Sequence, residues 1–200
     1  MRRIKNVVAE NYEKLRYEIY NNYQNFDKII NHNQSPECIR IWDFNDIETN
    51  LTELEKLKSY LKSKYVISKL QIVIYAPFTG TGFHSDGDGT NRYIYPLISD
   101  DGALNLEIDI NHSTKEYVDY YNTNLYGNKE ISRTTLNKEE YLSDLNEWFL
   151  SKSTNNKLYN VKENECWEIG KNIHAHLNIS FYHRIIVVFD TKDPIVDTLD

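Results

Sequence analysis

The segment from Cys166 to Asp190 constrains the fold more than any other stretch of this chain. Within it, Arg184 is followed by five consecutive apolar residues, Ile185 to Phe189, and the run is closed by Asp190. A short apolar run rich in β-branched residues and bounded by charges is typical of a buried strand. A guanidinium at the head of such a strand is costly to bury unpaired. We therefore expect Arg184 to meet either a bound carboxylate or a structural ion pair, with Asp190 or a helix carboxylate.

The rest of the chain divides into a helical first third and a strand-rich remainder. Apolar residues recur at three-to-four spacing over residues 6–31 and 49–65, which predicts two helices, and the alternation over 38–44 predicts a short strand between them. After Ile67, short β-branched or alternating segments predict strands at 70–75, 92–98, 103–110, 160–169, 173–179 and 184–189. The tight turn at 99–102 would join the second and third of these strands into a hairpin.

Short strands that follow a helical segment, with no helices alternating between them, favour an antiparallel barrel or a double-sheet jelly roll. We expect an α+β fold: a double-stranded β-helix (cupin-like jelly roll) with N-terminal helices packed on the sheet and a partly helical insertion. All 200 residues are taken as one domain. Residues 1–65 would form the helical N-terminal layer, 66–110 and 160–192 the jelly-roll core, and 111–159 an insertion or lid.

Composition excludes several classes of protein. The net charge of −7, from 23 basic and 30 acidic residues, argues against nonspecific nucleic-acid binding. Two cysteines, Cys38 and Cys166, are too few for a disulfide scaffold and indicate a reduced, cytoplasmic protein. The first residues lack the apolar core of a signal peptide, and no window approaches eighteen apolar residues, so we expect no membrane span.

His84 and Asp86 form a His-x-Asp pair whose side chains would share one face of a strand. Two histidines and one carboxylate can hold Fe(II) on one face and leave positions open for a cosubstrate and oxygen. The alternative is a chance pair, which a chain rich in aspartate offers often. A calcium loop starting at Asp86 is disfavoured because Thr90, Asn91 and Leu97 do not fit its pattern.

The second histidine ligand has three candidates, His174, His176 and His183. At least two of them must be ordinary core or loop histidines. The spacing of ten residues to Arg184 favours His174.

Two sets of residues repeat a known pattern in the same order. The downstream set is Cys166-Trp167, His174, Asn178, Arg184 and Asp190; the upstream set is Pro77, His84-Ser85-Asp86, Arg92, Pro96 and Leu97. Together they resemble the aspartyl/asparaginyl β-hydroxylase-like branch of Fe(II)/2-oxoglutarate dioxygenases, over about residues 65–110 and 160–192. The ninety residues between His84 and His174 exceed the expectation for this branch, which makes the intervening segment a candidate lid or substrate-recognition element. Ile94 also stands where the branch often carries a polar residue that contacts 2-oxoglutarate.

The resemblance implies an activity and a set of site residues. It implies that His84, Asp86 and His174 bind Fe(II), that Arg184 binds the 5-carboxylate of 2-oxoglutarate, and that Arg92 and Asn178 assist the cosubstrate. The expected reaction is hydroxylation of an unactivated C–H bond of an amino acid or peptidyl side chain, with release of succinate and CO2. Halogenating relatives lack the carboxylate ligand, so Asp86 favours hydroxylation.

Two other classes stay open from the sequence. One is a non-oxygenase cupin metalloprotein, such as an isomerase, which binds metal but does not consume 2-oxoglutarate. The other is a noncatalytic jelly-roll binding or structural module, for example a viral component, in which the histidines are incidental.

Overall fold

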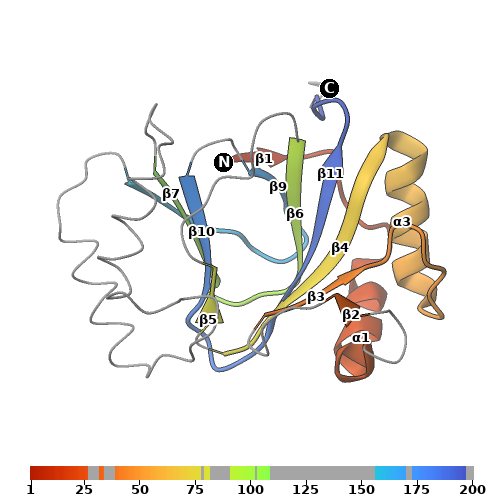
Figure 1. The fold of residues 1–200 in the computed structure, drawn as a ribbon, viewed down its shortest axis with the longest axis horizontal. Helices are drawn as coiled ribbons and strands as arrows, with labels where there is room; N and C mark the ends of the chain where they lie inside the picture. The colour runs from red at the N-terminus through yellow and green to blue at the C-terminus, as the bar shows by residue number, and fades with distance from the viewer. Residues whose placement is uncertain are drawn as a thin grey trace.

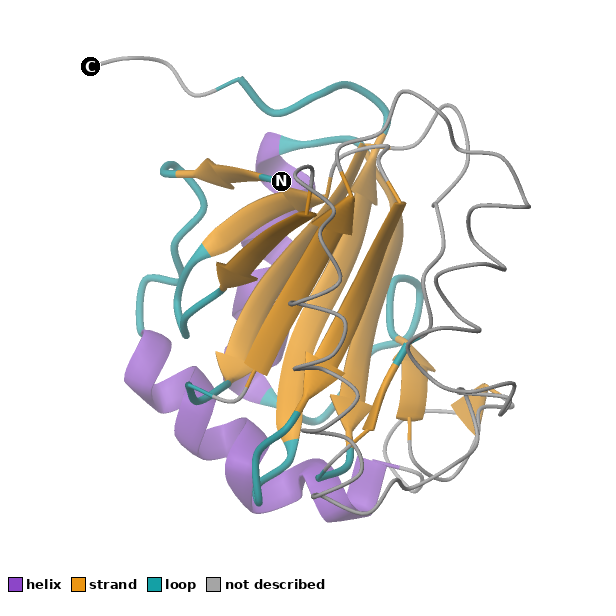
Figure 2. Ribbon diagram, turned by 90° about the vertical axis from the view of Figure 1, so that its left-hand side faces the viewer, coloured by secondary structure: helices purple, strands orange, loops and turns teal. Residues whose placement is uncertain are grey.

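The computed structural model describes residues 1–26, 32–33, 39–77, 79–81, 91–101, 103–108, 156–169 and 173–196. In this part of the chain, two antiparallel sheets face each other, and helices α1 and α3 cover the outer face of the larger sheet (Figure 1). The order of layers is therefore helices, major sheet, minor sheet. Figure 2 views the same arrangement from the side of the minor sheet.

The two sheets are built from strands that pair antiparallel throughout. The major sheet has the order β1 (Arg2–Ile4), β9 (Cys166–Ile169), β6 (Asn91–Ile98), β11 (Arg184–Thr191), β4 (Ile67–Tyr75), β3 (Ile39–Asp43), β2 (His32–Asn33). The minor sheet has the order β5 (Thr79–Gly80), β10 (Ile173–Asn178), β7 (Ala103–Ile108), β8 (Asn156–Asn160).

The eight strands β4 to β11 follow the path of a double-sheet jelly roll. In chain order, β4, β6, β9 and β11 belong to the major sheet and β5, β7, β8 and β10 to the minor sheet. The last strand of each sheet lies between two earlier ones: β11 between β4 and β6, and β10 between β5 and β7. This topology confirms the predicted fold class. β8 begins at Asn156, so the minor sheet includes the last residues of the segment that the sequence assigned to the insertion.

The hairpin predicted across residues 99–102 is wrong. β6 and β7 lie in different sheets, and the turn between them, where the Ala103 N–H donates to the Asp100 carbonyl at 3.0 Å, carries the chain from one sheet to the other. β7 pairs instead with β10 and β8. Turn residues favour a reversal of the chain, but they do not specify whether the two strands then pair.

The helical layer covers the outer face of the major sheet. It comprises α1 (Tyr12–Asn22), the 3-10 turn η1 (Tyr23–Asn25) and α3 (Thr52–Lys64). The two helices are joined at the start of α3, where Glu18 of α1 accepts hydrogen bonds from the backbone N–H groups of Glu53 and Leu54 at 2.9 and 3.0 Å. A carboxylate at a helix N-terminus satisfies unpaired donors and the helix dipole together.

The predicted helix over 49–65 is confirmed by α3, whereas the one over 6–31 begins only at Tyr12. The residues before Tyr12 instead form a strap across the sheet, and the backbone N–H of Ala9 donates to the Tyr95 hydroxyl at 3.0 Å. Residues 27–31 lie outside the described part of the chain.

β11 is buried along its whole length, as its apolar run predicts. Ile185, Val187 and Phe189 belong to the core beneath the helices, and Ile186 and Val188 to the core between the sheets. Because side chains alternate along a strand, Arg184 has the parity of the residues that face the minor sheet. Among the described residues, no helix combines the length and apolar character needed to cross a membrane.

Candidate functional site

Polar side chains are buried on the inner face of the minor sheet. β10 pairs with β7 so that His174 lies opposite Glu107 and His176 opposite Asn105, and all four residues are buried. The rings of His174 and His176 lie 5.3 Å apart between centroids. The His176 ring also lies 6.5 Å from that of Tyr75, which belongs to the core between the sheets. The alternation of β10 therefore presents two histidines to the interior of the jelly roll.

Asn105 connects one of these histidines to Arg184. Its Oδ1 accepts a hydrogen bond from Arg184 Nη2 at 3.0 Å and lies 2.6 Å from His176 Nδ1. Arginine only donates, so the amide atom that faces it is the oxygen. The same oxygen faces the imidazole, so Nδ1 carries the proton and Nε2 is the acceptor in the neutral ring.

Arg184 is 1% exposed and has no carboxylate within ion-pair distance among the described residues. Its Nη1 reaches the carbonyl oxygens of Leu104 and Leu177, both at a long 3.4 Å, and its guanidinium carbon lies 5.7 Å from the centre of the Tyr75 ring. Its Nε has no hydrogen-bond partner in the described structure. Burial lowers the pKa of Arg184 to about 10, so the guanidinium is still protonated at neutral pH. A buried cation in this state is unfavourable unless an anion joins it.

The structural ion pair that the sequence offered as an alternative for Arg184 is formed by another arginine. Asp190 binds Arg92 through two hydrogen bonds, Nε to Oδ1 at 2.8 Å and Nη2 to Oδ2 at 2.9 Å. Asp190 and Arg184 stand at opposite ends of β11, about 20 Å apart along the strand. The observed interaction of Arg92 is therefore a structural ion pair. The expected contact of Arg92 with the cosubstrate stays a prediction.

Asn178 also has hydrogen bonds of a structural kind. Its Nδ2 donates to the carbonyl oxygens of Ala76 and Tyr182 at 2.9 and 2.8 Å, and its Oδ1 accepts from the backbone N–H of Ser180 at 3.4 Å. These bonds hold the turn between β10 and β11 against the end of β4. Its assignment to 2-oxoglutarate likewise stays a prediction.

His84 and Asp86 lie outside the described residues, but the strand that leads to them is described. Thr81 donates its backbone N–H to the His176 carbonyl at 2.8 Å, and its Oγ1 accepts from the His176 N–H at 3.0 Å. The approach is close: a Cβ added at Gly80 would lie 2.6 Å from the same carbonyl oxygen. The chain thus passes directly beside His176 three residues before His84.

His183 is separated from the other two candidate histidines. Its ring packs against Tyr23 of the helical layer at 5.2 Å, and burial together with nearby Arg40 lowers its pKa. His183 thus packs against the helical layer, whereas His174 and His176 lie together on β10. Among the described residues, no three His, Cys, Asp or Glu side chains lie close enough together to form a metal site. His84 and Asp86 are not among the described residues.

Sequence reasoning missed Asn105 and Glu107. Both are polar residues two positions apart in a predicted strand, a spacing that places them on one face. The sequence does not show that this face is the interior. Glu107 forms an ion pair there with the α-amino group of Met1.

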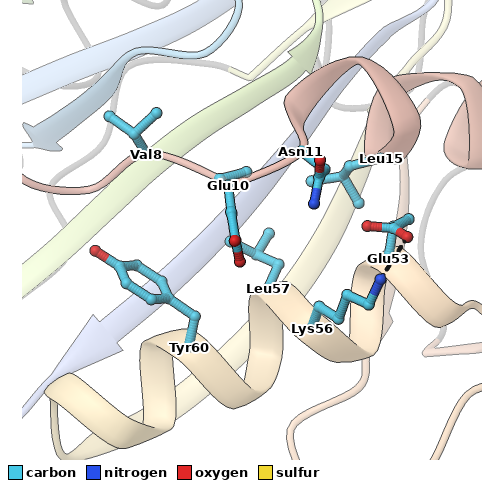
Figure 3. A pocket seen from close by; sticks show the side chains of 9 residues that line it. Val8, Glu10, Asn11, Leu15, Glu53, Lys56, Leu57 and Tyr60 are labelled. Carbon is cyan, nitrogen blue, oxygen red and sulfur yellow. Dashed lines mark hydrogen bonds and ion pairs between the residues drawn. The ribbon is translucent and has the colours of Figure 1, made fainter.

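Two of the pockets in the described structure lie along the helical layer, away from His174 and His176, and His183 lines one of them. One, of about 290 Å³, lies between α1, α3 and the residues before α1, and its rim carries the ion pair of Lys56 with Glu53 at 2.8 Å (Figure 3). None of the candidate site residues lines it. The other, of about 360 Å³, lies between α1 and the turn after β10, and Asn178 and Arg184 are among its lining residues.

The fold and the buried groups together define a jelly-roll protein with paired interior histidines and a buried arginine whose hydrogen-bond acceptors are uncharged. No protein-family model matches the chain, and no curated protein matches it in sequence.

Solved structures resemble it at low identity. AviO1 from Streptomyces viridochromogenes Tue57 aligns with a TM-score of 0.50 and 10% identity over 94% of this chain and 87% of its own. The non-heme alpha-ketoglutarate-dependent carbocyclase SnoK from nogalamycin biosynthesis aligns at 0.49 and 10% over 94% and 77%. The Lactobacillus farciminis oxalate decarboxylase aligns at 0.41 and 12% over 84% of this chain but only 32% of its own, so the chain spans about a third of that protein. The likeness to AviO1 shows the fold, and the aspartyl/asparaginyl β-hydroxylase-like assignment rests on the motif resemblance.

Proposed function

We propose that this chain is an Fe(II)- and 2-oxoglutarate-dependent oxygenase of the aspartyl/asparaginyl β-hydroxylase-like branch. It would hydroxylate a C–H bond of an amino acid or peptidyl side chain and release succinate and CO2. The observation that carries the proposal is Arg184, a buried cation with an unpaired Nε and no carboxylate within ion-pair distance in the described interior. A carboxylate of 2-oxoglutarate supplies the missing anion, and a guanidinium can bind it bidentately.

The chain's own residues fit the metal that this chemistry requires. His174 projects from β10 into the interior, and Thr81 is bonded to the same strand. His84 follows Thr81 by three residues, which limits their separation to about 11 Å. His84, Asp86 and His174 would hold Fe(II), which when bound activates oxygen for attack on the C–H bond. The inner-face apolar residues around Tyr75 and Ile186 would exclude water from the cosubstrate.

Residues 111–159 are proposed to cover the site as a lid; residues 111–155 lie outside the described part of the chain, and the last four belong to β8 of the minor sheet. Hydrogen exchange in this segment should slow when substrate and 2-oxoglutarate are added together. Unchanged exchange would make it a structural decoration.

The decisive experiment is an anaerobic titration of the apoprotein with Fe(II) and 2-oxoglutarate. The quantity measured is the visible charge-transfer absorption of their complex. Replacing Arg184 by Lys should weaken 2-oxoglutarate binding by about tenfold to a hundredfold, because a charge-assisted bond is worth about 1.5–3 kcal/mol, while Fe(II) affinity should stay within about twofold. Arg3→Lys is the matched control, since Arg3 pairs with Glu165 on the surface at 3.0 Å and does not line the pocket that Arg184 lines.

The same titration separates the rival classes. Metal binding without a 2-oxoglutarate complex would indicate a non-oxygenase metalloprotein, and no specific metal binding would indicate a noncatalytic module. His174→Ala and His176→Ala identify the ligand. If His176→Ala alone abolishes Fe(II) binding, the assignment of His174 is wrong.

A further inference from the structure

The buried arginine is held by a neutral acceptor although the site could accommodate a charged one of the same size. Asn105 is fully buried, and its Oδ1 is the hydrogen-bond acceptor closest to Arg184. It lies 3.0 Å from Nη2, whereas the two carbonyl oxygens lie 3.4 Å from Nη1. An aspartate differs from asparagine by little volume and would accept from both Arg184 and His176. It would also neutralise the guanidinium.

We propose that Asn105 is the positioning residue of the site: it orients Arg184 through an uncharged oxygen and so keeps the charge of the guanidinium available to a bound carboxylate. The inference rests on the proposed function for the identity of that carboxylate. A buried Arg–Asp pair would satisfy itself, as Arg92 and Asp190 do at the other end of β11. The two arginines of the interior therefore differ in the charge of their nearest acceptor, and only the one next to an amide is available for a ligand.

Asn105 also fixes the histidine strand relative to the arginine. The same oxygen accepts from Arg184 Nη2 and lies 2.6 Å from His176 Nδ1, so one side chain of β7 joins β10 and β11 across the space between the sheets. Side-chain contacts of this kind restrict rotamers on both sides, which is how a supporting residue sets the precision of a binding site.

Asn105→Asp and Asn105→Leu give opposite tests of this role at pH 8. Asp retains both bonds of Oδ1 and adds an ion pair, but it loses the donation of Asn105 Nδ2 to the Tyr159 carbonyl at 3.4 Å. We therefore expect a melting temperature close to that of the wild type together with 2-oxoglutarate binding weakened by about tenfold to a hundredfold. Leu removes the acceptor, so both the melting temperature and the affinity should fall. Asn160→Asp is the matched control, because it places the same charge at an exposed position of the minor sheet.

If Asn105 has a purely structural role, a different result is expected. The Asn105→Asp variant would then bind 2-oxoglutarate within about twofold of the wild-type affinity, and that result would overturn the proposal. A melting temperature of the Asn105→Asp variant as low as that of the Asn105→Leu variant would also overturn it, because the added ion pair would then be absent.

A separate measurement distinguishes failure of this inference from failure of the proposed function. A ligand-free double-mutant cycle of Asn105→Asp with Arg184→Gln measures the coupling of the two side chains whether or not the chain binds 2-oxoglutarate. Coupling that favours the Asp–Arg pair supports the charge argument, and additive effects refute it.

Discussion

The pair of Arg92 and Asp190 allows a quantitative test of how the interior of the jelly roll is stabilised. Asp190→Asn removes the charge and one acceptor while it preserves the shape of the side chain. The Asp190 side chain is 4% exposed and that of Arg92 is 20% exposed, so the substitution leaves a largely buried guanidinium without its anion. Loss of one partner of a buried pair costs 3–5 kcal/mol, and the partial exposure of Arg92 places our expectation at about 3 kcal/mol. For a chain of this size, that corresponds to a melting temperature lower by roughly 6–12 °C.

Urea unfolding monitored by tryptophan fluorescence measures this loss. Asp46→Asn is the control, because Asp46 is 89% exposed and lies 3.7 Å from Lys62, so its free energy of unfolding should change by less than about 0.5 kcal/mol. The double substitution Arg92→Met with Asp190→Leu should recover much of the loss, since an apolar pair of similar volume has no charge to desolvate. If Asp190→Asn unfolds within 0.5 kcal/mol of the wild type, the pair does not have the buried character described above.

Three further predictions concern packing and pH. Gly80→Ala should destabilise the protein by about 1–3 kcal/mol in urea unfolding, because its Cβ would lie 2.6 Å from the His176 carbonyl oxygen; a neutral result would contradict the close approach of β5 to β10. Tyr95→Phe should cost about 1–3 kcal/mol and speed hydrogen exchange of the Ala9 amide, which loses its acceptor; unchanged exchange would argue against the strap. Burial lowers the pKa of His183 below 6.5, so the stability that depends on its neutral form is complete above pH 6.5 and is lost as the pH falls through the folded-state pKa. His183→Gln should reduce this pH dependence of the free energy of unfolding, and an unchanged pH profile would refute the burial of His183.

Features encoded in contiguous residues could be predicted from the sequence, and features that depend on distant pairing could not. The run after Arg184 predicted β11 because burial on both faces needs an unbroken apolar segment. β1 was missed because its three residues pair only with β9, far along the chain, and carry no local signal. The turn at 99–102 was recognised, but its role as a crossing between sheets depends on which strand β7 meets.

The site shows the same division. Burial of Arg184 could be predicted from its apolar neighbours, whereas its closest acceptor, Asn105, belongs to a strand of the other sheet that is distant in the sequence. Asn105 gave no more signal than a polar residue in a strand. His174 and His176 could be placed on one face by their spacing, whereas the packing of His183 against Tyr23 depends on a contact between distant segments.

The position of β11 has a consequence for how the protein is made. β4 and β6 leave the ribosome long before the strand that belongs between them, whose partners on β4 run from Tyr75 with Arg184 to Ile67 with Thr191. Until that strand emerges, both neighbours present unpaired backbone groups and apolar faces on the inside of an incomplete sheet, and such edges pair readily with other chains. Nascent chains stalled before Arg184 should therefore depend on chaperones, because the sheet cannot close until its central strand is synthesised.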